Sequence, residues 1–308
     1  MSLLFRRYCK VKNMDTLRTL TAAIFLWLVV AMVAYLCLDF HHQSEEFFDT
    51  KLNKWNESSK QRRFFNSTVM IRFAEAFSDK DVLLMAAALR EFTFNLEKAN
   101  ITYFMIGGTL LGSYRHHGRI PWDDDVDFAV NEADEKRLAI LFRHLTAHTF
   151  LLFHASIGKF FPNDGHPIGR FKHRSPFIDI FWYKETASHI IFAWARRKFS
   201  KSDVFPLRRR PFGDLFLPAP CNTTAYLITE QGNTDMCKSR HFNHLKENSI
   251  PSSTVPCSQL AHIYPFVKRK RQLMKNGNLV VAEFLTVNET TVKQWSYEEN
   301  GCEYNVIV

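Results

Sequence analysis

The sequence predicts a mixed α/β fold of the α+β kind, in which helices flank a sheet and a transmembrane helix precedes them. The first observation is an uncharged apolar run close to the start of the 308-residue chain. The second is an alternation of helical patterns and short β-rich runs between residues 79 and 232. The third is the composition, 46% hydrophobic and 23% charged, which is typical of a globular protein with its own core.

The apolar run covers residues 19–38 and contains no charge. As a helix it would span about 30 Å, the thickness of the apolar core of a bilayer. It is longer than the apolar part of a cleavable signal peptide, and a buried helix of this length rarely stays uncharged on every face. Five basic residues and one acid precede the run, and acidic residues follow it. The positive-inside rule therefore leaves the N-terminus in the cytoplasm.

This topology predicts a single-pass type II protein of the Golgi or ER membrane, with a signal-anchor and a luminal main part. We divide the chain into a cytoplasmic tail, a transmembrane anchor, a luminal stem, a folded domain and a C-terminal extension of unclear structure. Their expected bounds are 1–18, 19–38, 39–67, 68–232 and 233–308.

Sequons for N-linked glycans fit a luminal chain and predict a glycoprotein. The expected sites are Asn56, Asn66, Asn222 and Asn288. Four cysteines follow the anchor, and an even number in an oxidising compartment permits two disulfides in three connectivities. The disulfide candidates are Cys221, Cys237, Cys257 and Cys302. One alternative is four unpaired thiols, and another is a zinc site of Cys237, His241 and His244, although that spacing fits no standard finger.

The first predicted helix covers residues 79–99, where apolar residues recur at helical spacing and Ser78 can cap the start. A β-rich run at 101–106 ends at two glycines, and a helix at 109–116 can begin there. The run 126–130 predicts a second strand.

Asn131 can cap a helix that extends to residue 148, with acids in the first turn, where the helix dipole favours them. A short helix at 223–230 is expected to stop at Gly232. Further strands are expected at 150–154, 168–173, 177–183 and 212–217.

Acidic residues alternate with apolar ones at the start of the second strand. Asp125 and Asp127 lie two residues apart, so on a strand both point to one face while Val126 and Phe128 enter the core. Two carboxylates so close repel each other unless a cation lies between them. Oxygen ligands of this kind suit Mg²⁺ or Mn²⁺. Asp179 lies in a similar apolar run, and if that strand lies alongside, it completes a three-carboxylate site.

The glycines suggest a phosphate site. Gly107 and Gly108 follow a strand and precede a helix, so backbone N–H groups and the helix dipole can hold a phosphate there. Thr109 adds a hydroxyl, and Arg115 and Arg119 can neutralise phosphate charge. The adjacent residues 116–117, both histidine, are either candidates for proton transfer or phosphate contact, or solvated residues at a helix end.

Each of these features is ordinary alone, since an acidic run is often a solvated loop and a strand aspartate is often structural. Their order resembles that of the nucleotidyltransferase superfamily, and the passage closely resembles the LicD family, which includes fukutin and fukutin-related protein. The matching runs are residues 107–112 (GGTLLG), Arg115 and residues 120–127 (IPWDDDVD). The similarity covers residues 101–232, and residues 233–308 show no family pattern.

The resemblance implies a nucleotidyltransferase-like mixed sheet and a metal-dependent phosphotransferase (EC 2.7) with its catalytic domain in the lumen. Such an enzyme moves a phospho-alditol, phosphocholine or similar phospho-linked group from a CDP-linked donor onto a hydroxyl of a glycan or glycoprotein acceptor. The ion held by Asp125 and Asp127 would bridge the donor diphosphate. Asp179 would either ligate the metal or accept the proton of the acceptor hydroxyl.

Two other functions remain to be weighed. A catalytically silent luminal scaffold or binding protein of the glycosylation machinery would keep the fold but has no use for a cluster of three acids. A nucleic-acid polymerase of the same superfamily conflicts with the predicted topology. The net charge of +9 is concentrated partly in the tail and forms no interleaved basic and aromatic stripe, so we expect no nucleic-acid partner. The expected partners are the donor, the acceptor and the lipid bilayer around residues 19–38.

Overall fold

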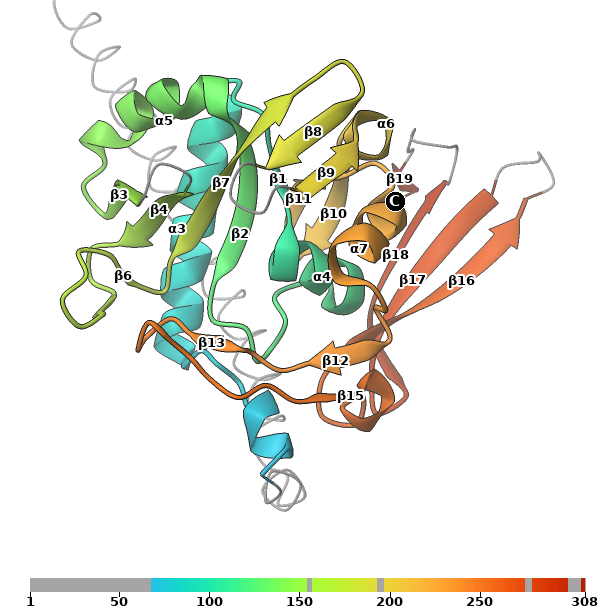
Figure 1. Cartoon of the computed structure of the whole chain (residues 1–308). Helices are drawn as coiled ribbons and strands as arrows, with labels where there is room; N and C mark the ends of the chain where they lie inside the picture. The colour runs from blue at the N-terminus through green and yellow to red at the C-terminus, as the bar shows by residue number, and fades with distance from the viewer. Residues whose placement is uncertain (1–67, 154–156, 193–196, 275–278, 299–305, 308) are drawn as a thin grey trace, which may run out of the picture. The chain divides into compact units, whose positions relative to one another are not determined.

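The computed structural model of the chain describes residues 68–153, 157–192, 197–274, 279–298 and 306–307 (Figure 1). All of them belong to one compact unit, residues 64–308. The predicted tail, anchor and stem, with Asn56 and Asn66, lie outside the described residues, as does Cys302. Among the helices that are described, none combines the length and apolar character needed to cross a bilayer.

A mixed seven-stranded sheet forms the centre of the unit, with the strand order β1-β2-β7-β4-β3 and with β8 and β9 continuing from β7. Strands β2 and β7 run parallel, and the other neighbours pair antiparallel. Their bounds are β1 Tyr103–Met105, β2 Val126–Asn131, β3 His148–Phe153, β4 Ile157–Pro162, β7 Ile178–Glu185, β8 His189–Phe192 and β9 Arg197–Ser200.

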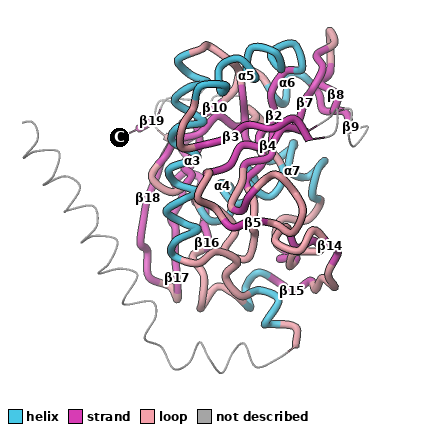
Figure 2. Tube along the Cα trace, turned by 90° about the vertical axis from the view of Figure 1, so that its left-hand side faces the viewer, coloured by secondary structure: helices cyan, strands magenta, loops and turns pink. Residues whose placement is uncertain are grey.

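Helix α3 (Asp79–Lys98) covers one face of this sheet (Figures 1 and 2). It begins with a capping box, in which the side chains of Ser78 and Asp81 each accept a backbone N–H of the other residue. Phe92 lies on its buried side and stacks on Phe128 of β2 at a ring-centroid distance of 5.3 Å. The odd-numbered residues of β2 therefore point to the opposite face, since side chains alternate along a strand.

That opposite face carries α4 (Gly107–His116) and α7 (Thr223–Gln231). Strand β1 leads directly into α4, and β1 pairs antiparallel with β2. The first residues of α4 therefore lie beside the first residues of β2, as the bond from the Ile106 N–H to the Asp127 carbonyl shows. The short helix α6 (Lys201–Val204) and the hairpin of β10 (Arg208–Phe212) and β11 (Leu215–Ala219) complete this side.

The C-terminal part builds two further structures. The first is a segment from β12 (Met236–Lys238) to β15 (Thr254–Pro256), with the hairpin β13 (Phe242–Asn243) and β14 (Asn248–Ser249) between them. The second is a four-stranded antiparallel sheet that packs on the end of α4. Its strands are β16 (Phe266–Leu273), β17 (Leu279–Val287), β18 (Thr290–Glu298) and β19 (Val306–Ile307).

Several predicted elements agree with the structure and three do not. The helix expected to reach residue 148 is shorter, because α5 covers only Glu135–Leu141 and β3 already begins at His148. The strand expected at 168–173 is a loop. The strand expected at 212–217 is divided by the turn of the β10–β11 hairpin: Phe212 ends β10, Gly213 adopts a φ of 65° in the turn, and residues 215–217 begin β11.

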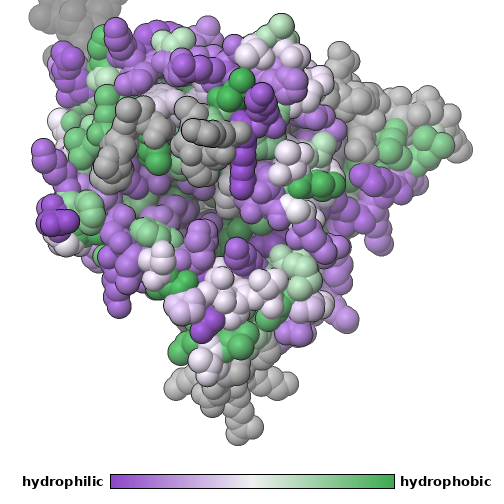
Figure 3. All heavy atoms as spheres, viewed as in Figure 1, coloured by the Kyte–Doolittle hydropathy of each residue, from purple (hydrophilic) through white to green (hydrophobic). Residues whose placement is uncertain are grey.

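Figure 3 shows the face viewed in Figure 1, where hydrophilic residues prevail and apolar residues are scattered among them. Scattered exposed apolar residues are normal for a folded protein and mark no site by themselves. The charged side chains that could form a site lie instead between the sheet, α4 and the segment 237–257.

Candidate active site

The parallel pairing of β2 with β7 brings two acids side by side. Asp127 and Asp179 are register partners, so both side chains lie on the sheet face opposite α3. Asp125 lies just before β2 and joins them. Ligand oxygens of Asp125, Asp127 and Asp179 all lie within 4.8 Å of one another. The sheet therefore assembles the three carboxylates that the sequence placed in two separate runs, and they form a candidate metal site.

Burial and mutual repulsion make this group of acids unfavourable in the absence of a cation. Burial raises the pKa of Asp125 to about 8, and the charges of Asp123 and Asp179 add to the shift. Burial and the charges of Asp125 and Asp179 also raise the pKa of Asp127 well above its ordinary value. A divalent ion between the three oxygens would relieve both effects, because an opposite charge favours the ionised form.

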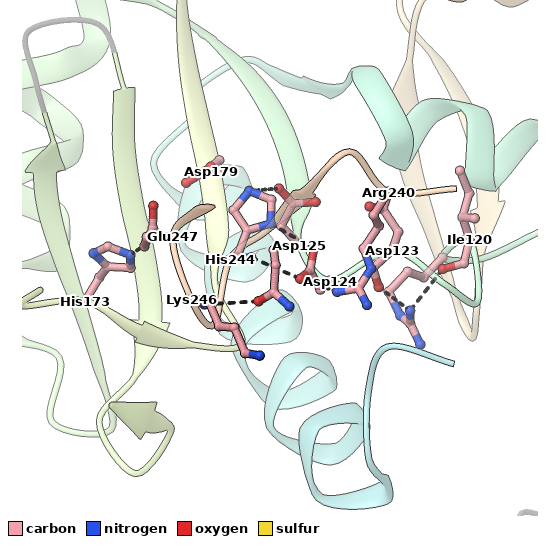
Figure 4. A network of polar contacts seen from close by, with 12 residues as sticks. Ile120, Asp123, Asp124, Asp125, His173, Asp179, Arg240, His244, Lys246 and Glu247 are labelled. Atoms are coloured by element: carbon pink, nitrogen blue, oxygen red, sulfur yellow. Dashed lines mark hydrogen bonds and ion pairs between the residues drawn. The ribbon is translucent and has the colours of Figure 1, made fainter. Parts of the chain in front are cut away.

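Two cationic side chains lie at the edges of the acid group. The Lys159 ammonium is buried on β4, donates to Asp179 Oδ1 at 2.7 Å and lies over the ring of Phe177 at 3.6 Å. His244 lies on the other side, with Nε2 at 3.2 Å from Asp125 Oδ2 (Figure 4). Burial lowers the pKa of His244, but its bond to Asp124 and the charge of Asp125 outweigh burial and raise it to about 9.

Asp124 holds the loop before β2 in place. Its carboxylate is buried, pairs with the Arg240 guanidinium and contacts the His244 ring at 2.8 Å (Figure 4). Burial alone would raise the pKa of Asp124, and the contacts with His244 and Arg240 lower it instead. Asp123 has the opposite balance, since burial and the charge of Asp124 raise its pKa to about 6. The acidic run is therefore a packed part of the site.

The first turn of α4 needs its glycines. Gly107 has a φ of 56°, and a Cβ on it would lie 2.8 Å from Asp127 Oδ2. A Cβ on Gly108 would collide with the Asp123 carboxylate. The N–H of Gly107 donates to Glu230 Oε2 at 3.0 Å, so a carboxylate from α7 occupies this donor. Burial raises the pKa of Glu230 to about 7. At the predicted phosphate site, the first turn of α4 therefore lies directly against the carboxylates of Asp123, Asp127 and Glu230.

The other predicted phosphate residues have partners in the protein. Thr109 is buried, and its Oγ1 accepts the Asp127 N–H at 2.7 Å, which ties α4 to β2. The Arg115 guanidinium is buried and donates toward the carbonyls of Thr234 at 3.5 Å and Met236 at 3.4 Å. Arg119 donates to three carbonyls of the loop before β2, those of residues 120, 121 and 123. Both arginines therefore hold backbone segments around the site.

The two adjacent histidines are not exposed to solvent, and neither contacts Asp125, Asp127 or Asp179. His116 is buried, and its Nδ1 contacts the Pro265 carbonyl at 2.6 Å. His117 is buried, and its Nε2 contacts Glu283 Oε2 at 2.7 Å. Burial lowers the pKa of both rings. They attach the C-terminal sheet to the end of α4, and the geometry gives them no part in proton transfer.

The segment between Cys237 and Cys257 forms one wall of the site. A disulfide joins these two cysteines, whose Cα atoms are 4.9 Å apart. Cys237 is therefore not free to bind zinc, and the alternative of a zinc site with His241 and His244 is wrong. We call residues 237–257 the disulfide loop. Cys221 is also disulfide-bonded.

The predicted glycan sites within the described chain are both exposed. Asn222 caps α7 by accepting the Ala225 N–H at 3.2 Å, and its amide donates to Asp203 at 3.1 Å. Asn288 lies in the turn between β17 and β18 with a φ of 45°.

The sequence patterns described above single out neither Lys159, Glu230 nor Arg240, and they suggest His244 only as a zinc ligand. Lys159 is a lysine in an apolar strand, and that unusual position could have identified it in the same way as Asp179. Glu230, Arg240 and His244 lie in segments whose position relative to the acids depends on long-range packing.

A family model described as the LicD/FKTN/FKRP nucleotidyltransferase domain matches residues 100–222. An uncharacterized protein of Rickettsia typhi is 28% identical over 154 residues, which cover 46% of this chain and 44% of that protein. The lipopolysaccharide cholinephosphotransferase LicD of Haemophilus influenzae is 46% identical over 41 residues, which cover 13% and 16% of the two chains. The chain thus spans less than half the length of these relatives.

Among solved structures, the lincomycin-bound lincosamide antibiotic adenylyltransferase LnuA aligns with a TM-score of 0.33 and 15% identity. The alignment covers 50% of this chain and 87% of that one. The matched family segment contains the glycines, the acidic run and the strand with Asp179. Residues 100–222 of this chain are thus similar to the LicD/FKTN/FKRP family of nucleotidyltransferase domains.

Proposed function

We propose that the protein is a metal-dependent phosphotransferase of the LicD and fukutin type. It would move a phospho-alditol, phosphocholine or similar phospho-linked group from a cytidine-diphosphate donor onto a hydroxyl of a glycan. The observation that carries the proposal is the group of Asp125, Asp127 and Asp179, with ligand oxygens within 4.8 Å and with raised pKa values at Asp125 and Asp127. Acids that are at least half-buried and repel one another are typical of a functional site.

The donor atoms favour Mg²⁺ or Mn²⁺. All three side chains offer carboxylate oxygens, which these hard cations prefer, and such sites commonly use a few carboxylates together with substrate phosphates. Asp125, Asp127 and Asp179 would hold the ion, and the bound ion would stabilise negative charge on the donor diphosphate.

Other side chains prepare the site for a charged donor. The N-terminus of α4 lies beside the acids, and the positive end of a helix dipole favours phosphate oxygens. Lys159 fixes the Asp179 carboxylate by donating to one of its oxygens. A fixed orientation is what a metal ligand requires, so we favour the ligand role of Asp179 over that of proton acceptor.

The proposed reaction is a displacement at the phosphorus atom of the transferred group. The oxygen of the acceptor hydroxyl forms a new bond to this phosphorus. The bond from the phosphorus to the bridging oxygen of the diphosphate breaks, and cytidine monophosphate leaves with that electron pair. The hydroxyl proton is released to the medium. Positioning and charge stabilisation supply most of the rate enhancement in such a transfer.

We also propose a location in the Golgi or ER membrane with the catalytic domain in the lumen. The uncharged run 19–38, the sequons and the disulfides at Cys221 and Cys237 support it. Endoglycosidase treatment of the expressed protein should increase its gel mobility. An unchanged mobility, together with a C-terminus open to protease in intact microsomes, would contradict this topology.

The activity can be tested on the purified full-length chain. CDP-ribitol and CDP-choline are incubated with it in Mg²⁺, Mn²⁺ or EDTA, and the release of cytidine monophosphate is measured. We expect release with one of these donors in the presence of a divalent ion and none in EDTA. A chain that binds Mn²⁺ but neither binds nor cleaves a cytidine-diphosphate donor would contradict the proposal and favour a silent scaffold.

A further inference from the structure

We propose that His244 is a ligand of the metal ion held by Asp125, Asp127 and Asp179, and that Asp124 orients it for this role. The inference rests on the proposed metal centre and adds a nitrogen ligand from a part of the chain that the family match does not reach. It also makes the disulfide loop a component of the active site.

The contacts of the imidazole ring are those of a metal-binding histidine. Its Nδ1 lies 2.8 Å from Asp124 Oδ1, and its backbone N–H donates to Asp124 Oδ2 at 3.2 Å. Metal-binding histidines commonly donate one ring N–H to a carboxylate, which fixes the tautomer and leaves the other nitrogen for the metal. With the Nδ1 proton donated to Asp124, Nε2 of His244 is the nitrogen left for an ion, and it lies 3.2 Å from Asp125 Oδ2.

Asp125 connects the histidine to the acid group. It belongs both to the set Asp125, Asp127 and Asp179 and to the set Asp124, Asp125 and His244, each with ligand atoms within 4.8 Å of one another. Asp125 is thus common to both sets, and an ion bound to it is where Nε2 of His244 would join the acids. Figure 4 shows the His244 ring between Asp124 and Asp125, with Asp179 on the neighbouring strand.

Two aromatic rings fix the plane of the imidazole. Phe177 meets His244 edge-on at a centroid distance of 5.4 Å, and Phe242 lies at 5.0 Å. Phe177 directly precedes β7, which carries Asp179. The histidine is therefore oriented by the same strand that positions one of the acids.

The disulfide loop is anchored on both sides of the site, so it can hold a ligand in a fixed place. The Trp122 Nε1–H donates to the Lys238 carbonyl at 3.0 Å near its start. Arg240 pairs with Asp124 in its middle. Near its tip, Glu247 contacts the buried ring of His173 at 2.9 Å. The loop is closed covalently at its base by Cys237 and Cys257.

A nitrogen ligand changes which metal the site prefers. Imidazole suits the transition metals, whereas Mg²⁺ favours oxygen ligands almost without exception. Three carboxylates and one imidazole therefore predict a preference for Mn²⁺ over Mg²⁺. If His244 only neutralised Asp125, it would be displaced when the ion binds, and the ion would keep an all-oxygen environment.

Pulsed electron paramagnetic resonance of the full-length chain loaded with one equivalent of Mn²⁺ separates these two roles, because it detects a nitrogen bound directly to the ion. We expect nitrogen modulation typical of a bound imidazole in the wild type and its loss in His244→Gln. Calorimetry should show that this variant binds Mn²⁺ at least about tenfold more weakly, while Mg²⁺ binding changes less.

The matched control is His241→Gln, which changes an exposed histidine of the same loop and should leave the spectrum and both affinities unchanged. Modulation that is absent from the Mn²⁺-loaded wild type, or that persists in His244→Gln, would overturn the inference. A chain that binds no divalent ion at all would instead overturn the proposed metal centre itself. If an active enzyme binds Mn²⁺ through oxygen ligands alone, the proposed function stands and only the ligand role of His244 is wrong.

Discussion

The protein contains two buried groups of charged residues that differ in their balance of charge. Around Glu283, one carboxylate with no exposed surface meets Arg210 at 3.0 Å, Arg269 at 2.8 Å and His117 at 2.7 Å. At the central strands β2 and β7, Asp125, Asp127 and Asp179 meet one another. In the first group cationic side chains surround one carboxylate, whereas in the second three carboxylates share Lys159 and His244 as cationic neighbours.

The pKa values of the two groups move in opposite directions. Burial alone would raise the pKa of Glu283, but Arg210, His117 and Arg269 outweigh it and hold the pKa far below the ordinary value. Burial and repulsion together raise the pKa of Asp125 and Asp127. The first group, in which cations outnumber the acid, attaches one sheet to a helix, whereas the second, in which acids outnumber the cations, is a candidate cation site. Burial of charge alone therefore does not distinguish a candidate metal site, whereas an excess of acids over cations does.

Asp127→Asn should produce the largest effect on activity. A small effect would contradict the difference between the two groups. The substitution keeps the shape of the side chain and removes one ligand charge, so we expect transferase activity to fall by about a thousandfold or more, or about 4 kcal/mol in transition-state stabilisation. In EDTA the same variant should be more stable than the wild type by about 1 kcal/mol, because repulsion is relieved. Activity assays and urea unfolding measure the two effects.

The control for this change is Asp214→Asn, which alters an exposed acid paired with Arg90. It should change activity little and stability by less than about 1 kcal/mol. Full activity of Asp127→Asn would show that the acid group is not the metal site.

Glu283→Gln should have the opposite effect on stability. It leaves the buried Arg210 and the half-buried Arg269 without their counter-charge, and breaking a buried ion pair costs about 3–5 kcal/mol. We expect a loss of this size in urea unfolding, unchanged by Mn²⁺. Glu97→Gln, at an exposed pair with Arg209, is the matched control and should cost less than about 1 kcal/mol. A loss at Glu283 that Mn²⁺ restores would contradict its structural role.

Lys159→Met tests whether a metal ion can replace a cation of the acid group. Lys159 is the buried cation on Asp179, so its loss should destabilise the protein in EDTA by about 3 kcal/mol. Saturating Mn²⁺ should restore most of that stability, because the ion supplies the missing positive charge. Thermal unfolding with and without Mn²⁺ measures the difference. Equal losses under both conditions would mean that Lys159 acts through packing on Phe177 alone.

The smallest effect concerns pH. The pKa of Asp125 rises from 3.8 to about 8 on folding, and that of Asp127 also rises. Between about pH 4 and 8 the folded, metal-free protein therefore holds protons that the unfolded chain has released, so its free energy of unfolding falls as the pH rises. We expect a decrease of about 1 kcal/mol or more between pH 5 and 8 in EDTA.

Asp127→Asn should flatten this dependence, and Glu283 contributes nothing to it in that range. Since the pKa of Glu283 is lowered, its stabilising contribution is present above the unfolded value of 4.5 and disappears only as the pH falls. A metal-free wild type whose stability rises between pH 5 and 8 would contradict the raised pKa values.

The sequence predicts the acid group better than its surroundings. Asp125 and Asp127 share a strand, and Asp179 is an acid in an apolar strand, so local spacing and the need of a buried acid for a partner were enough. Their alignment depends on the parallel pairing of β2 and β7, which the apolar runs suggest. The helix α3 and its capping residue Ser78 were predictable for the same reason, because their signals are local.

The rest depends on long-range contacts that leave no local pattern. His244 reaches Asp124 across 120 positions, and Glu283 reaches His117 across 166. Arg115 has the composition of a phosphate ligand but donates to backbone carbonyls, since the chain that surrounds it comes from residues 234–257. Residue type alone does not distinguish these roles.

The most direct test is a crystal of the protein grown with Mn²⁺, in which anomalous scattering locates the ion. We predict an anomalous peak within about 2.0–2.6 Å of carboxylate oxygens of Asp125, Asp127 and Asp179, and none beside Glu283. Mn²⁺ bound elsewhere, with these three acids free of metal at saturating concentration, would contradict the proposal that their excess of negative charge marks the metal site.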